Sequence, residues 1–344
     1  MTEKSMTLKT EKEMMEKYLS EPCTTLCKDG HVPYLLSGLA ELPLEYTQLD
    51  AARPWILYWC VCSLSVLGHT IPGEQKTAIL NSILECKSPR GGFGGGPGQD
   101  PHLATTYAAV AAIFSLGRQI TESPELREKL EIEKLVGFIK KMKQENGSYV
   151  VCDGGECDVR GLYCALAVLS LLEIDTEPFA ENTVKYIKSC QTYEGGFGCF
   201  PGDEAHSGHT FCCVSALKIL NSLDGIDARA ALRYSAQNQD TATGGMCGRT
   251  NKLEDGCYSF WGVAAIKTLC GLLEIENMDT VLDTEKLRVF ILTCCQTGGG
   301  FRDKPEMKPD FYHTFYCLAG LSLIGNKSDG LGRIDAVHGT FRAP

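Results

Sequence analysis

Apolar residues recur at helical spacing in segments that each follow a short glycine-rich loop. Three of these segments carry the apolar sets Tyr107, Val110, Ala111 and Phe114; Val159, Leu162, Leu166 and Leu169; and Phe211, Val214, Leu217 and Leu220. Ala, Gly and Cys fill much of the remaining circumference, so little of each helix has the composition of a solvated surface. The pattern predicts inner helices that are buried on nearly all sides.

The segments that precede the loops have a different pattern. Residues Glu131 to Lys143 and Thr284 to Cys294 alternate charged and apolar side chains at helical spacing. Such a helix buries one face and exposes the other. We therefore expect these segments to form outer helices that pack on the inner ones.

The loops repeat with a period of about 50 residues, which is typical of repeat architectures. They read Gly91-Gly92-Phe93-Gly94, Gly147-Ser148-Tyr149, Gly195-Gly196-Phe197-Gly198, Gly244-Gly245-Met246 and Gly299-Gly300-Phe301. Repeated pairs of one outer and one inner helix build either an open solenoid or a closed ring. Because the inner helices are apolar all round, we favour an all-α fold, an α/α barrel of about six pairs whose first inner helix runs from Arg53 to Leu67.

The barrel is expected to span residues 46–325. Residues 1–45 contain a charged helix, Thr7 to Leu19, and a connection with Pro and Gly, which predict an extension on the outside of the barrel or on a partner. Residues 326–344 begin with Asn326-Lys-Ser-Asp-Gly-Leu-Gly and predict a mobile C-terminal tail.

Composition narrows the functional classes. The 344 residues are 44% hydrophobic and carry a net charge of −10, which argues against a general nucleic-acid binder. The 18 cysteines lack paired CxxC spacing, and the first 21 residues resemble no signal peptide, so a reducing, cytoplasmic location is expected. No apolar run approaches the roughly twenty residues of a membrane span.

The repeat predicts where chemistry would occur. If every glycine loop turns the chain from an outer to an inner helix, all inner helices start at one rim and their first turns share one mouth. Helix N-termini there would favour an anionic group. The predicted mouth residues are Trp55, Trp59, His102, Asp158, Arg160, Tyr163, His206, His209, Arg249, Lys252, Asp255, Cys257, Tyr258, Asp303, Asp310, Tyr312 and His313.

The stretch from Arg249 to Trp261 is the densest part of this mouth. Asp255 and Cys257 are separated by one glycine and could reach one metal ion. A catalytic zinc usually has three protein ligands and an open position. His313, at the start of the next inner helix, is the predicted third ligand. The alternative is that Asp255 caps a helix and Cys257 is an ordinary buried cysteine.

At these residues the chain resembles the β subunits of the protein prenyltransferases, and their farnesyltransferase branch most closely. The resemblance extends from about Leu49 to Ile324. It is carried by Arg53-Pro-Trp, Gly91-Gly-Phe-Gly-Gly-Gly-Pro-Gly-Gln, Asp158-Val-Arg, Arg249-x-x-Lys252, Asn251-Lys-Leu-x-Asp-Gly-Cys-Tyr-Ser-Phe-Trp and Asp310-Phe-Tyr-His-Thr.

The resemblance implies a zinc enzyme that transfers a farnesyl group from farnesyl diphosphate to the cysteine of a C-terminal C-a-a-X sequence. It implies one Zn²⁺ on Asp255, Cys257 and His313, a diphosphate site at His206, Arg249, Lys252 and Tyr258, and catalytic roles for Lys252 and Tyr258. The alternatives are that Arg249 or Lys252 pairs with Glu254 on the surface, and that His206 is a core or turn histidine.

An apolar wall for the isoprenoid is implied at Arg160, Tyr163, Tyr107, Gly208, Cys212, Trp261, Trp55 and Tyr316. Residues implied near the peptide are Trp55, Trp59, Ala104 and Tyr312. Without the resemblance, aromatics on inner helices would simply be core. The bulk of Trp55 and Tyr316 favours farnesyl over the longer geranylgeranyl group, and the alternative is a geranylgeranyltransferase type I β subunit.

Further implications concern Mg²⁺ and partners. Asp303 matches a carboxylate that helps hold magnesium against the diphosphate, and its alternative is a solvated loop acid. Family members act with an α subunit of helical-hairpin repeats on C-a-a-X proteins such as small GTPases. A terpene cyclase would need an Asp-rich acid motif, which the chain lacks. A non-catalytic helical-repeat scaffold would not require Asp255, Cys257 and His313 to lie close together.

Three features depart from the family pattern. His209 stands where an aromatic phenol is usual and predicts a more polar lipid wall. Phe315 replaces a smaller residue and is expected to narrow the peptide channel. The tail lacks the closing segment with Pro and aromatic residues.

Overall fold

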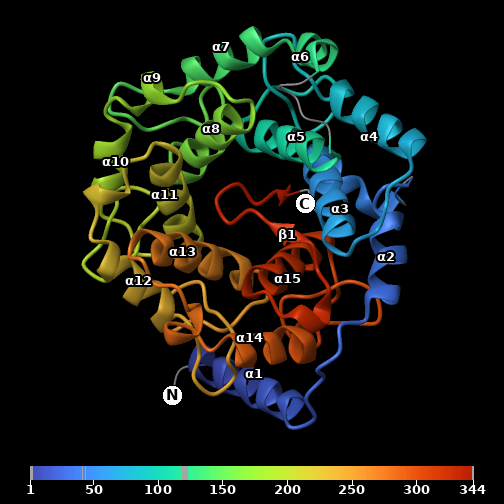
Figure 1. The fold of residues 1–344 in the computed structure, drawn as a ribbon, viewed down its shortest axis with the longest axis vertical. Helices are drawn as coiled ribbons and strands as arrows, with labels where there is room; N and C mark the ends of the chain where they lie inside the picture. Colours follow the sequence, from blue (N-terminus) through green and yellow to red (C-terminus); the bar gives the residue numbers. More distant parts are fainter. Residues whose placement is uncertain (1–2, 41, 43, 118–122, 343–344) are drawn as a thin grey trace.

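Six inner helices form a closed ring within residues 3–40, 42, 44–117 and 123–342, which the computed structural model describes (Figure 1). Each helix contacts the next, and the last, α15, also packs against the first, α3. They are α3 (Arg53–Val66), α5 (Leu103–Ser115), α8 (Val159–Leu171), α11 (Ser207–Ile219), α13 (Tyr258–Leu272) and α15 (Phe311–Ile324). The ring confirms the predicted α/α barrel and excludes an open solenoid.

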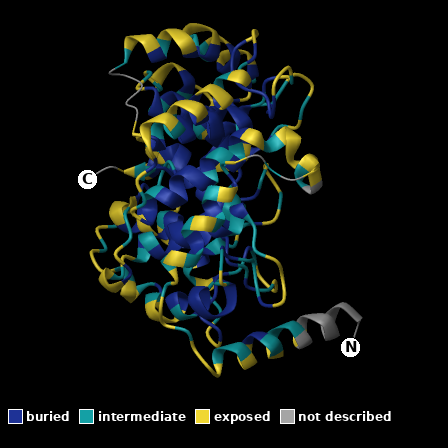
Figure 2. Ribbon diagram, turned by 90° about the vertical axis from the view of Figure 1, so that its right-hand side faces the viewer, coloured by how far each residue is buried: buried dark blue, intermediate teal, exposed yellow. Residues whose placement is uncertain are grey.

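The outer layer is amphipathic, as its sequence pattern predicts. The predicted segment Glu131 to Lys143 forms α7, whose residues Leu135, Phe138 and Ile139 are buried. Exposed faces lie along the outside of the molecule (Figure 2). The outer helices are α4 (Gly73–Glu85), α6 (Pro124–Leu130), α7 (Ile132–Met142), α9 (Glu177–Ala180), α10 (Thr183–Ser189), α12 (Ala228–Gln237) and α14 (Thr284–Phe290), the last continued by a π-helical turn, η5 (Ile291–Cys295).

The N-terminal residues lie outside the ring. Helix α1 (Glu3–Leu19) packs against η5, the continuation of α14, and α2 (Lys28–Ser37) packs on α3 (Figure 1). Met15 of α1 is buried, and Nζ of Lys12 lies 2.5 Å from a carboxylate oxygen of Asp240. Short 3₁₀ turns occur at η1 (Leu44–Ala52), η3 (Leu223–Gly225), η4 (Met278–Thr280) and η6 (Lys327–Asp329).

The glycine loops join the inner helices into one rim. The start of each of the first five inner helices donates a backbone hydrogen bond to the loop before the next one. The pairs are Arg53 to Gly95 (3.0 Å), Leu103 to Val151 (2.8 Å), Val159 to Cys199 (3.0 Å), Ser207 to Gly248 (2.7 Å) and Gly256 to Asp303 (2.8 Å). The inner helices therefore do begin at one end of the barrel.

Glycine is required in these loops because they press against the outer helices. Gly195 has a φ of +101°, and a Cβ there would lie 2.4 Å from the carbonyl oxygen of Ala230 on α12. Only a residue without a side chain accepts both the left-handed backbone and this contact.

The C-terminal residues close the other end of the barrel. Strand β1 (Arg333–Ile334) pairs antiparallel with β2 (Phe341–Arg342), and the hairpin points into the centre of the ring (Figure 1). The hairpin enters at the end of the barrel where the inner helices end. Gly332, just before β1, donates a hydrogen bond to the carbonyl of Val66, the last residue of α3 (2.7 Å).

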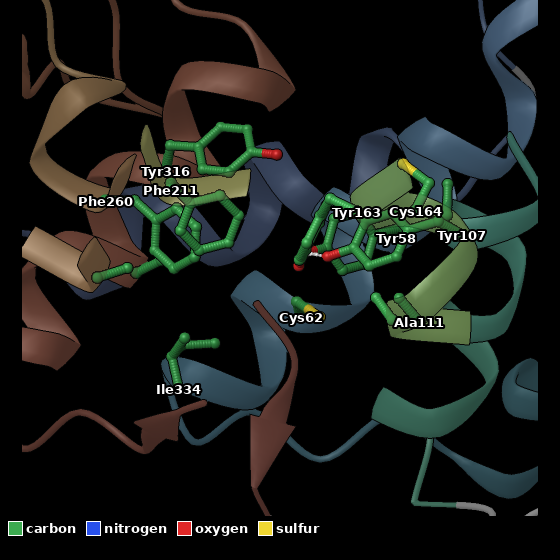
Figure 3. Close-up of a cluster of buried hydrophobic side chains, with 14 of the residues drawn as sticks. Tyr58, Cys62, Tyr107, Ala111, Tyr163, Cys164, Phe211, Phe260, Tyr316 and Ile334 are labelled. Carbon is green, nitrogen blue, oxygen red and sulfur yellow. Dashed lines mark hydrogen bonds between the residues drawn. The ribbon is translucent and has the colours of Figure 1, made fainter. Parts of the chain in front are cut away.

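Three tyrosines of the inner helices hold the tip of this hairpin. Their hydroxyls donate to backbone carbonyls: Tyr58 to Gly339 (2.6 Å), Tyr107 to His338 (2.6 Å) and Tyr163 to Val337 (3.0 Å). The three rings gather in the middle of the barrel, where the hydroxyl oxygens of Tyr58 and Tyr107 lie 3.1 Å apart (Figure 3). The expectation of a mobile tail is therefore wrong for residues up to 342, because these buried donors fix the backbone.

No helix in the described ranges combines the length and the apolar character that a membrane crossing requires.

Candidate active site at the mouth of the barrel

The three predicted metal ligands meet at the mouth. One donor atom each of Asp255, Cys257 and His313 lies within 4.8 Å of the other two. Asp255 and Cys257 immediately precede α13, and His313 lies in the first turn of α15. Nε2 of His313 is 3.3 Å from a carboxylate oxygen of Asp255. Two neighbouring inner helices thus bring His313 to residues that lie 56 and 58 positions earlier in the sequence.

Asp310 orients the histidine of this cluster. One of its carboxylate oxygens caps α15 by accepting the backbone N–H of His313 (2.7 Å), and the other lies 2.7 Å from Nδ1 of the His313 ring. The ring therefore presents Nε2 to Asp255. Such a carboxylate behind a ligating histidine fixes the ring and its tautomer.

The repeat predicts Asp310 at the mouth but assigns it no role. An Asp three residues before a candidate histidine ligand, at a predicted helix start, is the signal that could have found it. Burial lowers the pKa of His313, but the hydrogen bonds to Asp255 and Asp310 outweigh burial and raise it to about 10.

The donor set fits a zinc ion. Zinc binds thiolate, imidazole and carboxylate at about 2.0–2.3 Å, which separates the ligands of a tetrahedral site by roughly 3.5 Å. The Asp255 and His313 donors lie 3.3 Å apart, and all three donor atoms lie within 4.8 Å of one another. Cys257 is buried, which raises the pKa of its thiol, and its backbone N–H donates to Asp255 (2.8 Å). If Asp255 were only a helix cap and Cys257 only a core cysteine, nothing would explain why His313 lies beside them.

His206 and Tyr258 form a second pair at the mouth. His206 caps α11, and its Nδ1 accepts the backbone N–H of Gly208 (3.1 Å). Burial, together with the charges of His209 and Arg249, lowers the pKa of His206 to about 4. The neutral ring carries its proton on Nε2, which lies 3.2 Å from the hydroxyl of Tyr258. His206 is thus a rim residue and not a core histidine.

The two predicted cations lie on the same rim. Arg249 pairs with Glu204 (2.6 Å) rather than with Glu254, which is buried and accepts a hydrogen bond from Thr243 (2.7 Å). Lys252 is exposed. The Arg249 guanidinium is therefore held at the mouth by a partner that is itself exposed to solvent.

An aromatic cavity of about 450 Å³ lies beside the metal-type cluster, and its size suits a small ligand. It gathers nearly all residues predicted for isoprenoid and peptide contact. The lining comprises Trp55, Trp59, Ala104, Tyr107, Arg160, Tyr163, Cys212, Trp261, Tyr312 and Tyr316, together with His102, Val151, Glu156, Gly161 and Cys164.

The lining departs from the prediction at one position and extends it at others. Gly208, expected in the lipid wall, lies in the first turn of α11 beside His206 and outside the lining. No sequence pattern marks the further lining residues Val151, Glu156, Gly161 and Cys164, because residue type alone does not say which side chains of a loop or helix face a cavity. Arg160 is held by Asp158, whose carboxylate oxygen lies 2.6 Å from its guanidinium.

The cavity connects to the cluster through Tyr312. Its ring centroid is 4.9 Å from that of His313, and its hydroxyl accepts a hydrogen bond from the Trp261 indole (3.3 Å). Tyr107 and Tyr163, which also line the cavity, bond the hairpin tip. The cavity therefore runs from the metal-type cluster to the aromatic layer above the C-terminal hairpin.

Two further predicted residues lie differently from what their patterns indicate. Phe315 is fully buried, with its ring 4.9 Å from that of Tyr58, and is absent from the cavity lining. The expectation that it narrows the peptide channel is wrong, because its side chain faces α3. Asp303 is bonded to Lys304, whose ammonium lies 2.6 Å from its carboxylate. Lys304 is a mouth cation that the sequence analysis missed.

Comparisons with known proteins identify the family. The family model of the prenyltransferase alpha-alpha toroid domain matches residues 26–340. The chain is 40% identical to the protein farnesyltransferase subunit beta of Schizosaccharomyces pombe, covering 86% of this chain and 77% of that protein. It is 35% identical to the corresponding subunit of Arabidopsis thaliana, covering 90% and 74%.

A solved structure shares the whole architecture. The Candida albicans protein geranylgeranyltransferase-I complexed with GGPP superposes with a TM-score of 0.79 at 22% identity, covering 92% of this chain and 96% of that one. At this identity the likeness supports the fold alone. The family model and the two relatives above place the chain in the family of protein prenyltransferase β subunits.

Proposed function

We propose that this chain is the catalytic subunit that transfers a farnesyl group from farnesyl diphosphate to a cysteine thiol near the carboxyl end of a protein. One observation carries the proposal: Asp255, Cys257 and His313 converge beside a cavity whose wall is aromatic. A thiolate-binding centre next to an apolar pocket is the combination that S-prenylation needs. The farnesyltransferase subunits among its relatives support the same reaction.

Asp255, Cys257 and His313 would hold one Zn²⁺, which supplies a Lewis acid that keeps a substrate thiol deprotonated at neutral pH. In the transfer, the substrate sulfur forms a bond to C1 of the isoprenoid, and the C1–O bond breaks as diphosphate leaves with its electron pair. Asp310 keeps the ring of His313 oriented throughout. Tyr312 packs against that ring and lines the cavity, so it guides the thiol-bearing peptide towards C1.

The departing diphosphate would meet donors on the rim. Tyr258 and His206 lie within hydrogen-bond distance of each other, and Arg249 and Lys252 add positive charge. Positioned donors of this kind stabilise the charge that develops on a leaving group. Asp303 is proposed to contribute a carboxylate for Mg²⁺ against the diphosphate, which requires Lys304 to release it.

Trp55 and Tyr316 are proposed to limit the length of the lipid. The Trp55 ring stacks on Trp59 at 5.5 Å, and Tyr316 packs on Trp261 at 4.4 Å, so neither ring can swing away easily. Burying fifteen carbons at about 0.8 kcal/mol each gives on the order of 10 kcal/mol before ordering costs. Five further carbons would need space that these rings occupy.

The proposed context is a heterodimer. We infer that the chain works with a prenyltransferase α subunit, modifies C-a-a-X proteins such as small GTPases, and acts in the cytoplasm. The relatives are themselves named as β subunits, which supports a partner chain. The charged groups of the rim remain accessible for a second subunit to complete the diphosphate site.

The test is a transfer assay with farnesyl and geranylgeranyl diphosphate, a C-a-a-X peptide, and the chain with and without its α subunit. We expect farnesylation by the complex and little or none by the chain alone. A peptide whose cysteine is replaced by serine is the control, since a hydroxyl is far less nucleophilic than a thiolate. Preferential geranylgeranylation would replace the farnesyl assignment, and no transfer of either lipid would favour a binding scaffold.

A further inference from the structure

A second set of three donors lies elsewhere on the mouth. One donor atom each of Cys199, Asp203 and His209 lies within 4.8 Å of the other two, and all three residues are half-buried. Cys199 and Asp203 belong to the loop before α11, and His209 lies in the first turn of that helix. The resemblance and the proposed prenyl transfer assign no metal to these residues.

The loop that carries two of these donors is tightly wound. A Cβ on Gly198 would lie 2.7 Å from the carbonyl oxygen of Asp203, so only glycine lets the chain fold back at this point. The backbone N–H of Cys199 donates to the Asp203 carboxylate (3.2 Å). The carbonyl of Cys199 in turn accepts from Val159 at the start of α8 (3.0 Å). The loop therefore has a fixed backbone, and its Cys199 and Asp203 donor atoms lie within 4.8 Å of each other.

The third donor shows an independent sign of a missing partner. Nδ1 of His209 exposes less than 1 Å² and has no hydrogen-bond partner among the described residues. Most buried polar side-chain atoms are paired, and an exception requires an explanation such as an absent ion. The other three histidines of the mouth differ, since Nδ1 of His102 accepts from Ala104, Nδ1 of His206 accepts from Gly208, and Nδ1 of His313 contacts Asp310.

We propose that Cys199, Asp203 and His209 form a second metal site, for a borderline transition-metal ion of the Zn²⁺ class. Thiolate and imidazole select such ions over Mg²⁺ and Ca²⁺, which prefer oxygen ligands. The donor set is the same as that of the Asp255, Cys257 and His313 cluster. Small side-chain rotations bring the donors to the roughly 3.5 Å spacing of a tetrahedral zinc site, and half-buried side chains allow them.

The position of the site gives it an electrostatic consequence. The rings of His209 and His206 are 4.7 Å apart, so an ion on His209 adds positive charge next to the proposed diphosphate residues. This consequence rests on the proposed function, whereas the metal site itself does not. Charges this close interact strongly at a partly buried rim.

Metal content of the full chain, purified with its partner subunit and equilibrated against zinc, tests the site. We expect about two zinc ions per chain in the wild type, one for each donor set. Cys199→Ser and His209→Phe are each expected to lose one ion and to keep the other. Cys152→Ser, a half-exposed cysteine in the preceding rim loop, is the matched control and keeps both.

Cobalt substitution gives a readout that does not depend on activity. Each site holds one thiolate, so the thiolate-to-cobalt absorption band should fall by about half in Cys199→Ser and by about half in Cys257→Ala. A wild type with one ion and an unchanged band in Cys199→Ser would overturn the second site and leave the proposed function intact. An unchanged band in Cys257→Ala would instead count against the proposed zinc centre of the transferase.

Discussion

The two ends of the barrel are built in opposite ways. At the mouth, six helices begin, their loops are joined by backbone hydrogen bonds, and charged and metal-binding side chains collect in the first turns. At the closed end, a polar hairpin fills the centre of the ring and satisfies three buried tyrosine hydroxyls. The mouth keeps its polar groups accessible for ligands, whereas the closed end uses its polar groups to hold the chain together. Substitutions at the two ends should therefore affect different properties.

The largest effect is expected for Cys257→Ala at the mouth. Removing one ligand of the proposed zinc centre should lower the transfer rate by more than about 100-fold. Loss of even an outer hydrogen-bond partner of a metal ligand lowers metal affinity or activity by about 10–100-fold. Metal content and transfer rate check this, and thermal unfolding should change little. Cys152→Ser is the control for loss of a rim thiol. If Cys257→Ala kept the full transfer rate, the mouth would not be the end of the barrel that carries out the chemistry.

Asp310→Asn should have the next largest effect. Asparagine keeps the cap of α15 and the shape of the side chain, so the fold should be retained. It removes the charge that orients His313, and metal affinity should fall by about 10–100-fold. Competition with a coloured chelator measures this affinity. If affinity is unchanged, Asp310 acts only as a helix cap.

How far the sequence predicts each end follows from the kind of interaction involved. The mouth could be predicted because the glycine loops repeat, and a repeat places equivalent positions at one rim even when they are far apart in the chain. Asp255, Cys257 and His313 could therefore be grouped before any coordinates. The lining residues Glu156 and Cys164 could not, since their side-chain directions depend on how neighbouring helices rotate.

The closed end could not be predicted from its own residues. Its strands have two residues each, and the segment from Asn326 to Gly332 has the composition of a disordered linker. What fixes it are hydroxyls of Tyr58, Tyr107 and Tyr163 on three different helices. These tyrosines appear in the sequence as ordinary aromatic core positions, and nothing near residue 338 indicates that they require acceptors.

Asp335→Asn tests the closed end through stability. Asp335 is buried, and its carboxylate accepts the backbone N–H groups of Val337 (2.7 Å) and His338 (2.8 Å). Burial alone would raise the pKa of Asp335, but the bonds to His338 and the charge of Arg342 hold the pKa well below its usual range. The variant should cost about 1–3 kcal/mol of unfolding free energy at pH 7.

The pH dependence of this cost has a definite sign. A carboxyl group whose pKa is depressed in the folded state stabilises the protein above its unfolded pKa of about 4, and that contribution is lost as the pH falls further. The difference between wild type and Asp335→Asn in urea unfolding should therefore be full at pH 7 and shrink below about pH 4. If wild type and variant differed by the same unfolding free energy at pH 7 and below pH 4, the charge of Asp335 would not be what holds the hairpin.

The smallest expected change, Trp55→Thr, lies between the two ends. Trp55 lines the cavity, stacks on Trp59 and packs 5.8 Å from Tyr107, so it joins the mouth to the tyrosine layer above the hairpin. Replacing the indole by a small side chain should admit a lipid that is about one third longer, and relative use of geranylgeranyl diphosphate in a competition assay should rise about 10-fold, or about 1.4 kcal/mol. Trp55→Phe keeps a ring and should keep the farnesyl preference. If both variants leave the preference unchanged, lipid length is set by the tyrosine layer and the closed end has a part in specificity after all.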